Sequence, residues 1–592
     1  MKRIVWILPF LLLSVSLHAQ KAVKLPAVPS PSSPDITAKE LKTHITWLAS
    51  DALEGRGTGT PSIDLAADYI AREFKRYGLK PAGDNGSYFQ TFEVITGVEL
   101  TKHTLSLRLD GGEVPVEEGQ FMPYTFSASG EFQGRPVFVG YGITAPSGER
   151  DDYGRQDVTG RVVLVRAGYP EDADPHGSLP MLASARAKAL TAREHGAAAL
   201  LIIHDDDREV HEFRYDRSPS DAGIPVGKIH IEAARRILDA AGIGSQVLEP
   251  GTIIMPQDDV QLEVAGNFAV SLVRKNTRNV LASLDGTEYS DYFVVGAHYD
   301  HLGWGQEGSL YRGEEPMIHN GADDNASGTA GMLELAQWYA AHPQRHAMLF
   351  MAFSGEEMGL LGSGHWVDNP TVPLAKIRAM YNLDMIGRLI DSTRQLNVQG
   401  IATSPIWKAI VEKENDTEKF NLALIDDGQG SSDHSSFYTK GIPVLFFFTG
   451  LHTDYHRPSD DADKIDYAGE EKVTRYVAEI ISDADAADEI PFTKVVKNEE
   501  QQVARFNVYV GTIPDYSANE HGFRINGTSP GSPADKAGLK EGDIITRFGD
   551  TEVRNIYDYM TALSRHKPGE EVPVVVLRGE DHVTLNVALV SK

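Results

Sequence analysis

The sequence predicts an α/β protein: an α/β sandwich with a mixed, largely parallel central sheet, joined by a β-rich insert domain and a smaller C-terminal domain. Three patterns predict this fold class. Apolar strands alternate with helices from about residue 279, short β runs dominate from about residue 136, and the last ninety or so residues have a pattern of their own. The length of 592 residues is enough for three to five domains of roughly 100–200 residues each.

The composition indicates a folded protein with an acidic surface. Hydrophobic residues make up 41% of the chain and charged residues 24%, and 56 Lys and Arg against 84 Asp and Glu give a net charge of −28. Such a surface repels nucleic-acid phosphates and anionic lipids, which argues against both as partners. The chain has no cysteine, so a bound metal must take His, Asp and Glu ligands.

The N-terminal end has the pattern of a targeting segment. Lys2 and Arg3 precede the uncharged apolar run 4–13, which predicts a secretory signal over residues 1–19 and a periplasmic or secreted protein. A membrane anchor is the less favoured alternative, because the run is shorter than the roughly 20 apolar residues that span a bilayer. No later segment is apolar enough to span one, and residues 20–35, rich in Pro, Ser and Ala, are expected to be a linker.

Two amphipathic helices are predicted at the start of the folded chain. Their apolar residues recur at helical spacing: Leu41, Ile45 and Leu48 in the first helix, and Leu65, Ile70 and Phe74 in the second. The second is expected to end at Gly78, since glycine commonly follows a helix. Both helices fall in the segment 36–130, which we assign to the N-terminal part of the main domain.

The segment 131–265 is predicted to be the β-rich insert. Its expected elements are strands at 137–139, 162–165 and 198–203 and a helix over 183–195. With Gly140-Tyr141-Gly142 and Gly196-Ala197-Ala198, this pattern resembles a PA (protease-associated) domain, an insert found in several peptidase families.

The segment 500–592 is predicted to be the C-terminal domain. It resembles a PDZ domain in Ser532-Pro533-Ala534, Ala537-Gly538-Leu539 and Glu541-Gly542-Asp543-Ile544-Ile545, and in a late strand at 572–577. The loop Tyr509-Val510-Gly511-Thr512-Ile513 lies where that family binds a chain-terminal carboxylate. The resemblance therefore implies a peptide C-terminus as a partner.

Candidate metal ligands stand at the ends of the predicted strands of the main domain. Apolar strands at 292–297, 347–353 and 444–448 accompany a helix over 329–339, and sheets of this kind bind ligands at the carboxyl ends of their strands. The five candidates are His298, Asp324, Glu357, Asp384 and His456. No two are close in sequence, so only the fold can bring them together.

Each of these positions also has a plainer interpretation. His298 and Asp300 point to the same side of a strand, so the carboxylate can orient the imidazole, but a His-x-Asp at a strand end is more often ordinary polar structure. Asp324 precedes a helix and could simply cap it. Of Glu356 and Glu357, one can ligate a metal while the other acts as a base, or both can be solvated.

The order and spacing of these residues together closely resemble the M28 family of co-catalytic zinc peptidases, which contains bacterial aminopeptidases. The resemblance covers residues 38–130 and 268–490, including Leu53-Glu54-Gly55-Arg56 and Gly57-Thr58-Gly59. It implies a peptidase catalytic domain over 268–490, two Zn²⁺ per chain and peptide substrates.

The resemblance also implies a role for each candidate. Asp324 is expected to bridge the two ions and to have a cis peptide bond to Asn325, as in relatives. The remaining roles are these: His298 and Asp384 complete one zinc site, Glu357 and His456 complete the other, Glu356 is the general base, Asp300 orients His298, and Tyr455 hydrogen-bonds the tetrahedral intermediate. The segment 428–437 is expected to form a wall of the substrate pocket.

The implied function is that of an exported co-catalytic di-zinc exopeptidase, an aminopeptidase that removes N-terminal residues through a metal-activated water with Glu356 as general base. Three alternatives remain open. A carboxypeptidase on the same scaffold would need a basic pocket for the terminal carboxylate. A glutaminyl cyclase of the family typically uses one metal, and a non-catalytic peptide-binding scaffold would need no complete set of ligands and base.

Overall fold

The computed structural model describes residues 33–591 with short gaps, so the predicted signal 1–19 and most of the predicted linker 20–35 lie outside the described residues. The gaps are 110–111, 146–149, 155, 171–172, 174–178, 214, 216–219, 250–251, 253, 255–256, 258–259, 314, 391, 496–507, 515–520 and 530. None of the helices in the described stretches is both long and apolar enough to cross a membrane.

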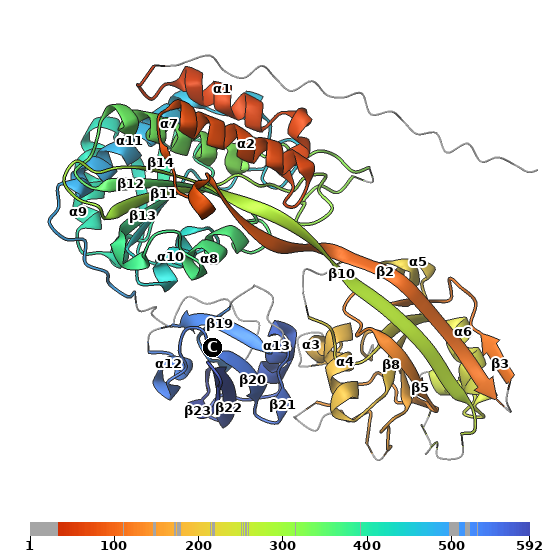
Figure 1. The fold of residues 1–592 in the computed structure, drawn as a ribbon. Coiled ribbons are helices and arrows are strands. Elements are labelled where there is room, and N and C mark those ends of the chain that lie inside the picture. Colours follow the sequence, from red (N-terminus) through yellow and green to blue (C-terminus); the bar gives the residue numbers. More distant parts are fainter. Residues whose placement is uncertain are drawn as a thin grey trace, which may run out of the picture.

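The main domain is built on one eleven-stranded mixed sheet (Figure 1). Its strands are β1 (Lys80–Pro81), β2 (Phe89–Leu109), β3 (Gly112–Pro115), β5 (Gly130–Gly134), β10 (Glu263–Leu284), β11 (Tyr292–His298), β12 (Ala347–Phe353), β13 (Ile377–Leu383), β14 (Gln395–Gln399), β15 (Asn421–Ile425) and β16 (Val444–Phe448). The order is β15-β14-β16-β13-β11-β12-β10-β2-β3, with β1 and β5 also paired to β10. The run β16-β13-β11-β12 is parallel, and antiparallel pairs flank it on both sides.

Helices cover both faces of this sheet, which explains why its central strands are apolar throughout. One face carries α1 (Ala38–Leu48), α2 (Pro61–Arg76), α7 (Gly328–Ala341), α9 (Trp407–Glu418) and α11 (Tyr467–Asp485), and the other carries α8 (Leu361–Asp368) and α10 (His434–Thr439) (Figure 1). Along β12, Phe350 packs into the core of the first face and Leu349 into that of the second. The carboxyl ends of the parallel strands are left for loops.

Residues that favour helix starts stand at the N-terminal ends of the first two helices. The side chain of Thr37 accepts a hydrogen bond from the Glu40 backbone N–H and caps α1, and Pro61 stands in the first turn of α2. One detail differs from the prediction, because Leu65 is 39% exposed. The arc of α2 that faces the core is covered instead by residues such as Ile63 and Ile70, and Leu65 lies outside it.

The insert domain is joined to the main domain by the long antiparallel ribbon of β2 and β10 (Figure 1). Its own sheet has the order β4-β9-β8-β7-β6, parallel except for β4. The elements are β4 (Phe121–Pro123), β6 (Pro136–Phe138), β7 (Val162–Arg166), β8 (Ala199–His204) and β9 (Val226–His230), with α3 (Leu179–Leu182), α4 (Ala185–Glu194), α5 (Asp207–His211) and α6 (Ile231–Ala240). Because β4 precedes residue 131, this sheet also takes in part of the segment assigned to the main domain.

The C-terminal domain lies between the other two domains (Figure 1). Its elements are β17 (Val508–Tyr509), β18 (Thr512–Pro514), β19 (Phe523–Thr528), α12 (Pro533–Ala537), β20 (Ile544–Phe548), β21 (Thr551–Glu552), α13 (Ile556–Ser564), β22 (Glu571–Arg578), β23 (Asp581–Ala588) and β24 (Val590–Ser591). Asp558 of α13 accepts a hydrogen bond of 3.0 Å from Arg193 of α4. On the other side, Lys440 of the main domain pairs with Glu541.

Candidate metal centre

The structure brings the five predicted ligands together at the carboxyl ends of the parallel strands. His298 is the last residue of β11, Glu357 follows β12, and Asp384 follows β13. Asp324 stands in the turn before α7, and His456 lies in the loop after β16. The sequence separates these residues widely, and the shared edge of one sheet is what makes them neighbours.

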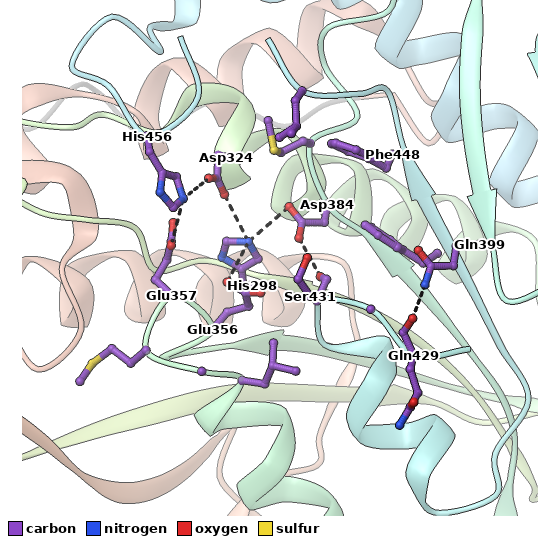
Figure 2. Close-up of a pocket in the computed structure, with 18 of the residues that line it drawn as sticks. His298, Asp324, Glu356, Glu357, Asp384, Gln399, Gln429, Ser431, Phe448 and His456 are labelled. Atoms are coloured by element: carbon purple, nitrogen blue, oxygen red, sulfur yellow. Dashed lines mark hydrogen bonds and ion pairs between the residues drawn. The ribbon is translucent and has the colours of Figure 1, made fainter. Parts of the chain in front are cut away.

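His298 lies at the centre of the first cluster (Figure 2). Its Nε2 atom is 3.3 Å from Oδ1 of Asp384, 3.4 Å from Oδ1 of Asp324 and 3.9 Å from Oε2 of Glu356. The His298 side chain is only 1% exposed. One buried imidazole nitrogen therefore has three carboxylates within 3.9 Å.

The second cluster shares Asp324 with the first (Figure 2). The Nε2 atom of His456 is 3.3 Å from Oδ2 of Asp324 and 3.2 Å from Oε2 of Glu357. The two oxygens of Asp324 thus face different imidazoles, Oδ1 toward His298 and Oδ2 toward His456. A carboxylate in this position has one oxygen to offer to each of two cations.

His301 is a member of the second cluster that the sequence analysis missed. Its Nδ1 atom is 2.7 Å from Oε1 of Glu357 and 3.8 Å from Oδ2 of Asp324, and its side chain is fully buried. The only sequence signal is its place three residues after His298, in a polar run that follows an apolar strand.

Asp300, which is expected to orient His298, lies beside that ring and also contacts the loop after β12. Its carboxylate is 3.7 Å from Nδ1 of His298, which is longer than a hydrogen bond, and that nitrogen is 3.2 Å from the backbone carbonyl of Asp300. The carboxylate accepts hydrogen bonds from the backbone N–H groups of Glu356 and Glu357, at 3.1 and 3.3 Å, and from the hydroxyl of Thr58 at 2.9 Å. Asp300 therefore holds the loop that carries both glutamates.

The turn that carries Asp324 is fixed by a second buried carboxylate. Oδ2 of Asp460 accepts hydrogen bonds of 3.0 Å from the backbone N–H groups of both Asp323 and Asp324. The peptide bond between Asp324 and Asn325 is cis, as expected. The role of Asp460 was not visible in the sequence, because nothing in the pattern around residue 460 links it to a turn 136 residues earlier.

Imidazoles control the ionisation of the two carboxylates between them. Burial would raise the pKa of Asp324, but His301, His298 and His456 outweigh burial and hold that pKa well below its usual range. Burial and Asp324 would likewise raise the pKa of Glu357, but hydrogen bonds from His301 and His456 hold it at about 2. Both carboxylates are therefore anionic at neutral pH, as metal ligands must be.

Glu356 is perturbed in the opposite direction. Burial raises its pKa well above the usual range, and Asp384 and Asp433 add to this effect while His298 opposes it. A carboxyl group in such surroundings readily takes up a proton, which is the property of a general base that must hold one.

The clusters open into a cavity of about 1370 Å³. Tyr455 lines it and stacks on the His456 ring with centroids 3.9 Å apart. Ser431 and Ser432 line it too, which places part of the predicted wall 428–437 there, and the Ser432 hydroxyl donates a hydrogen bond of 2.7 Å to Asp384.

The donor set fits a metal such as zinc. Two groups of side chains each offer ligand atoms within 4.8 Å of one another: His298, Glu356 and Asp384 in one, and His301, Asp324 and Glu357 in the other. Mixed imidazole and carboxylate donors suit Zn²⁺, and Mn²⁺ or Co²⁺ can use the same set. The chemistry of the donors therefore agrees with the metal expected from the sequence.

Comparison with known families places three matches along the chain. Residues 279–481 match the family model for Peptidase family M28, residues 132–237 that of the PA domain and residues 501–589 that of the PDZ domain. These matches confirm the resemblances expected from the sequence. The mixed sheet with its two additional domains confirms the predicted fold class.

Three relatives illustrate how far the similarity extends. Aminopeptidase YwaD of Bacillus subtilis is 26% identical over 52% of this chain and 63% of its own length. A probable zinc metalloprotease of Pyrenophora tritici-repentis is 38% identical over 19% of this chain and 25% of its own length. An aminopeptidase of Pseudomonas aeruginosa is 26% identical over 67% of each chain. The chain thus covers less than two thirds of the length of the first two relatives.

Proposed function

The chain carries a peptidase family M28 domain together with a PA domain and a PDZ domain, and on that premise we propose that it is a zinc aminopeptidase. One observation carries the proposal: Asp324 places one carboxylate oxygen toward each of two imidazoles, and a buried glutamate with a raised pKa lies beside them. Relatives that are named aminopeptidases support the same activity.

Two zinc ions per chain are proposed to bind at this edge of the sheet. His298 and Asp384 hold one, Glu357 and His456 hold the other, and Asp324 bridges them, in keeping with the contacts among these side chains. Paired ions of this kind lower the pKa of water and polarise the scissile carbonyl. His301 binds Glu357 through Nδ1 and so positions that ligand.

Glu356 is the proposed general base. It takes a proton from the attacking water and passes it to the leaving amine, and its raised pKa makes the protonated form stable between these two steps. Asp300 fixes the Glu356 backbone through the N–H group, so the carboxyl group is presented at a constant place. Tyr455, which lines the cavity beside His456, is placed to donate a hydrogen bond to the tetrahedral oxyanion.

The cavity lining that the main domain supplies, within the described residues, lacks the basic side chains expected of a carboxypeptidase. Among the described residues that line the cavity, those of the main domain include four carboxylates and no Lys or Arg. These four carboxylates are the proposed ligands Asp324, Glu357 and Asp384 and the proposed base Glu356, so two bound Zn²⁺ would offset their charge. The basic pocket that a carboxypeptidase requires is therefore not offered by the lining of the main domain.

Amino acid release from matched peptides tests this function. The substrates are one peptide with both ends free, the same peptide N-acetylated and the same peptide C-amidated, each assayed with zinc and after chelation. We expect hydrolysis of the first and third, none of the second, and none after chelation. Cleavage of the N-acetylated peptide from its C-terminus would establish a carboxypeptidase. Bound zinc with no hydrolysis would establish a binding scaffold.

Export is proposed from the charged start and apolar run of the N-terminal end. The test is the mass of the mature protein after expression of the whole chain in a bacterium, with fractionation of periplasm and medium. Loss of residues 1–19 in those fractions is expected. Intact protein confined to the cytosol would contradict export.

A further inference from the structure

The C-terminal domain forms part of the wall of the catalytic cavity. Phe523 and Arg524, at the start of β19, line the cavity. Arg554, just before α13, and Ile556 and Met560 of α13 line it too. A cavity of about 1370 Å³ exceeds the roughly 300–1,000 Å³ of sites for small ligands. It has room for several residues of a peptide beyond the one that is removed.

The arginines of the cavity lie on one wall. Among the described residues that line the cavity, two are arginines, both in the C-terminal domain, and none is a lysine. A peptide whose N-terminus lies at the metal centre extends its C-terminal carboxylate away from that centre, and an arginine is a suitable partner for this carboxylate.

The two arginines already have acidic partners, and the geometry of these pairs is loose. Arg524 is 3.4 Å from Asp368 and Arg554 is 3.5 Å from Asp221. Their side chains are 31% and 40% exposed, and exposed pairs of this kind are weak. Because a guanidinium has five N–H donors, it can donate hydrogen bonds to a second carboxylate while it keeps its present partner.

We infer that Arg524 and Arg554 bind the C-terminal carboxylate of short peptides whose N-terminus lies at the metal centre. The inference rests on the proposed aminopeptidase function and adds its substrate class: oligopeptides with a free carboxylate, of a length that spans the cavity. An extended chain advances about 3.3–3.6 Å per residue, so the preference for the acid should depend on peptide length.

This carboxylate site is distinct from the loop predicted to capture a peptide end. Among the described residues that line the cavity, none comes from 509–513. The predicted loop precedes β19, whereas the arginines stand at the beginning of β19 and just before α13. The C-terminal domain therefore contributes to substrate selection through a face other than its expected peptide-binding loop.

The test measures kcat and KM for peptides of two to six residues with the same N-terminal residue, each as free acid and as C-terminal amide. At the best length we expect a KM about tenfold lower for the acid, the size of one charge-assisted hydrogen bond, with kcat unchanged. The double variant Arg524→Ala/Arg554→Ala is expected to abolish this ratio and to leave the amide's kcat and KM unchanged, which also shows that the variant is folded.

Two further variants separate carboxylate binding from domain docking. Arg565→Ala removes a contact between Arg565, the residue after α13, and Glu194 of the insert domain. Arg565 is not among the described residues that line the cavity. This variant is expected to keep the acid-to-amide ratio. Asp221→Asn removes the partner of Arg554 and is expected to lower the KM of the acid further.

Each result bears on either carboxylate binding by the arginines or the aminopeptidase function. Hydrolysis with equal KM for acid and amide at every length would overturn this inference and leave the aminopeptidase intact. Loss of the ratio in Arg565→Ala as well would overturn it in favour of domain docking. Absence of hydrolysis for every peptide, with zinc bound, would instead overturn the proposed function.

Discussion

The main-domain wall of the cavity and the C-terminal-domain wall hold their polar side chains in different ways. In the first, the side chains of His298 and Asp324 are 1% and 5% exposed, and the turn around Asp324 is fixed by Asp460. In the second, the side chains of Arg524 and Arg554 are 31% and 40% exposed and have acidic partners at 3.4 and 3.5 Å. Peptide-bond cleavage requires rigidly held side chains, because it tolerates little misplacement of the reacting groups. Binding of a flexible peptide end does not require such rigidity.

Asp324→Asn is expected to have the largest effect, because it removes the one carboxylate that faces both imidazoles. Zinc affinity should fall by more than about 100-fold, beyond the loss typical of residues that only support a ligand, and hydrolysis should fall with it. Metal analysis after dialysis measures this. Asp426→Asn, at an exposed position, is the control. Full zinc content in Asp324→Asn would contradict the bridge.

Glu356→Gln is expected to separate chemistry from metal binding. The loss of a general base should lower kcat by about 10²–10⁴-fold, while zinc content stays at the wild-type level. Steady-state kinetics combined with metal analysis on the same sample decide the matter. Normal turnover in a fully zinc-loaded variant would remove Glu356 from the mechanism.

His301→Gln and His456→Ala are expected to differ, although both histidines contact Glu357. Because His301 is proposed to position Glu357, His301→Gln should lower zinc affinity by about 10–100-fold. Excess zinc should restore the activity of this variant. Excess zinc should not restore the activity of His456→Ala, because His456 is a proposed zinc ligand. Activity titrated against zinc in each variant makes the comparison, and the reverse pattern would exchange the two roles.

Lys440→Met tests how the C-terminal domain docks on the main domain and should have the smallest effect. Lys440 joins the main domain to Glu541 and also pairs with Asp368 at 2.9 Å. Surface pairs contribute about 0.2–1 kcal/mol each, so the unfolding temperature should fall by only a few degrees and dipeptide turnover should stay within about twofold of wild type. Thermal unfolding and dipeptide kinetics measure both. A large loss of dipeptide turnover would mean that the C-terminal domain takes part in the chemistry.

The buried centre of the fold was the part most visible in the sequence. The predicted strands 347–353 and 444–448 coincide with β12 and β16, because a strand buried on both faces is apolar throughout and ends where polar residues begin. The ribbon of β2 and β10 was not predicted. Many of its residues are exposed, so polar and apolar residues mix along it without a clear period.

Site residues that follow an apolar strand could be predicted from the sequence. Residues that contact the site from loops distant in sequence could not. His298 and Glu357 stand directly after apolar runs, and the family resemblance gives each a role. Asp460 and His301 have no such mark, since their contacts depend on how loops meet in three dimensions. Arg524 and Arg554 reach the cavity because the C-terminal domain docks there through a few ion pairs. No local sequence pattern predicts that docking.

Zinc titration of the chelated protein tests the central claim most directly. The readout is release of the N-terminal residue from a short peptide with free ends, with its N-acetylated form as the control. The account predicts no release without zinc, a return of activity that saturates at two equivalents per chain, and no cleavage of the control. Full activity in protein from which zinc has been removed would contradict it.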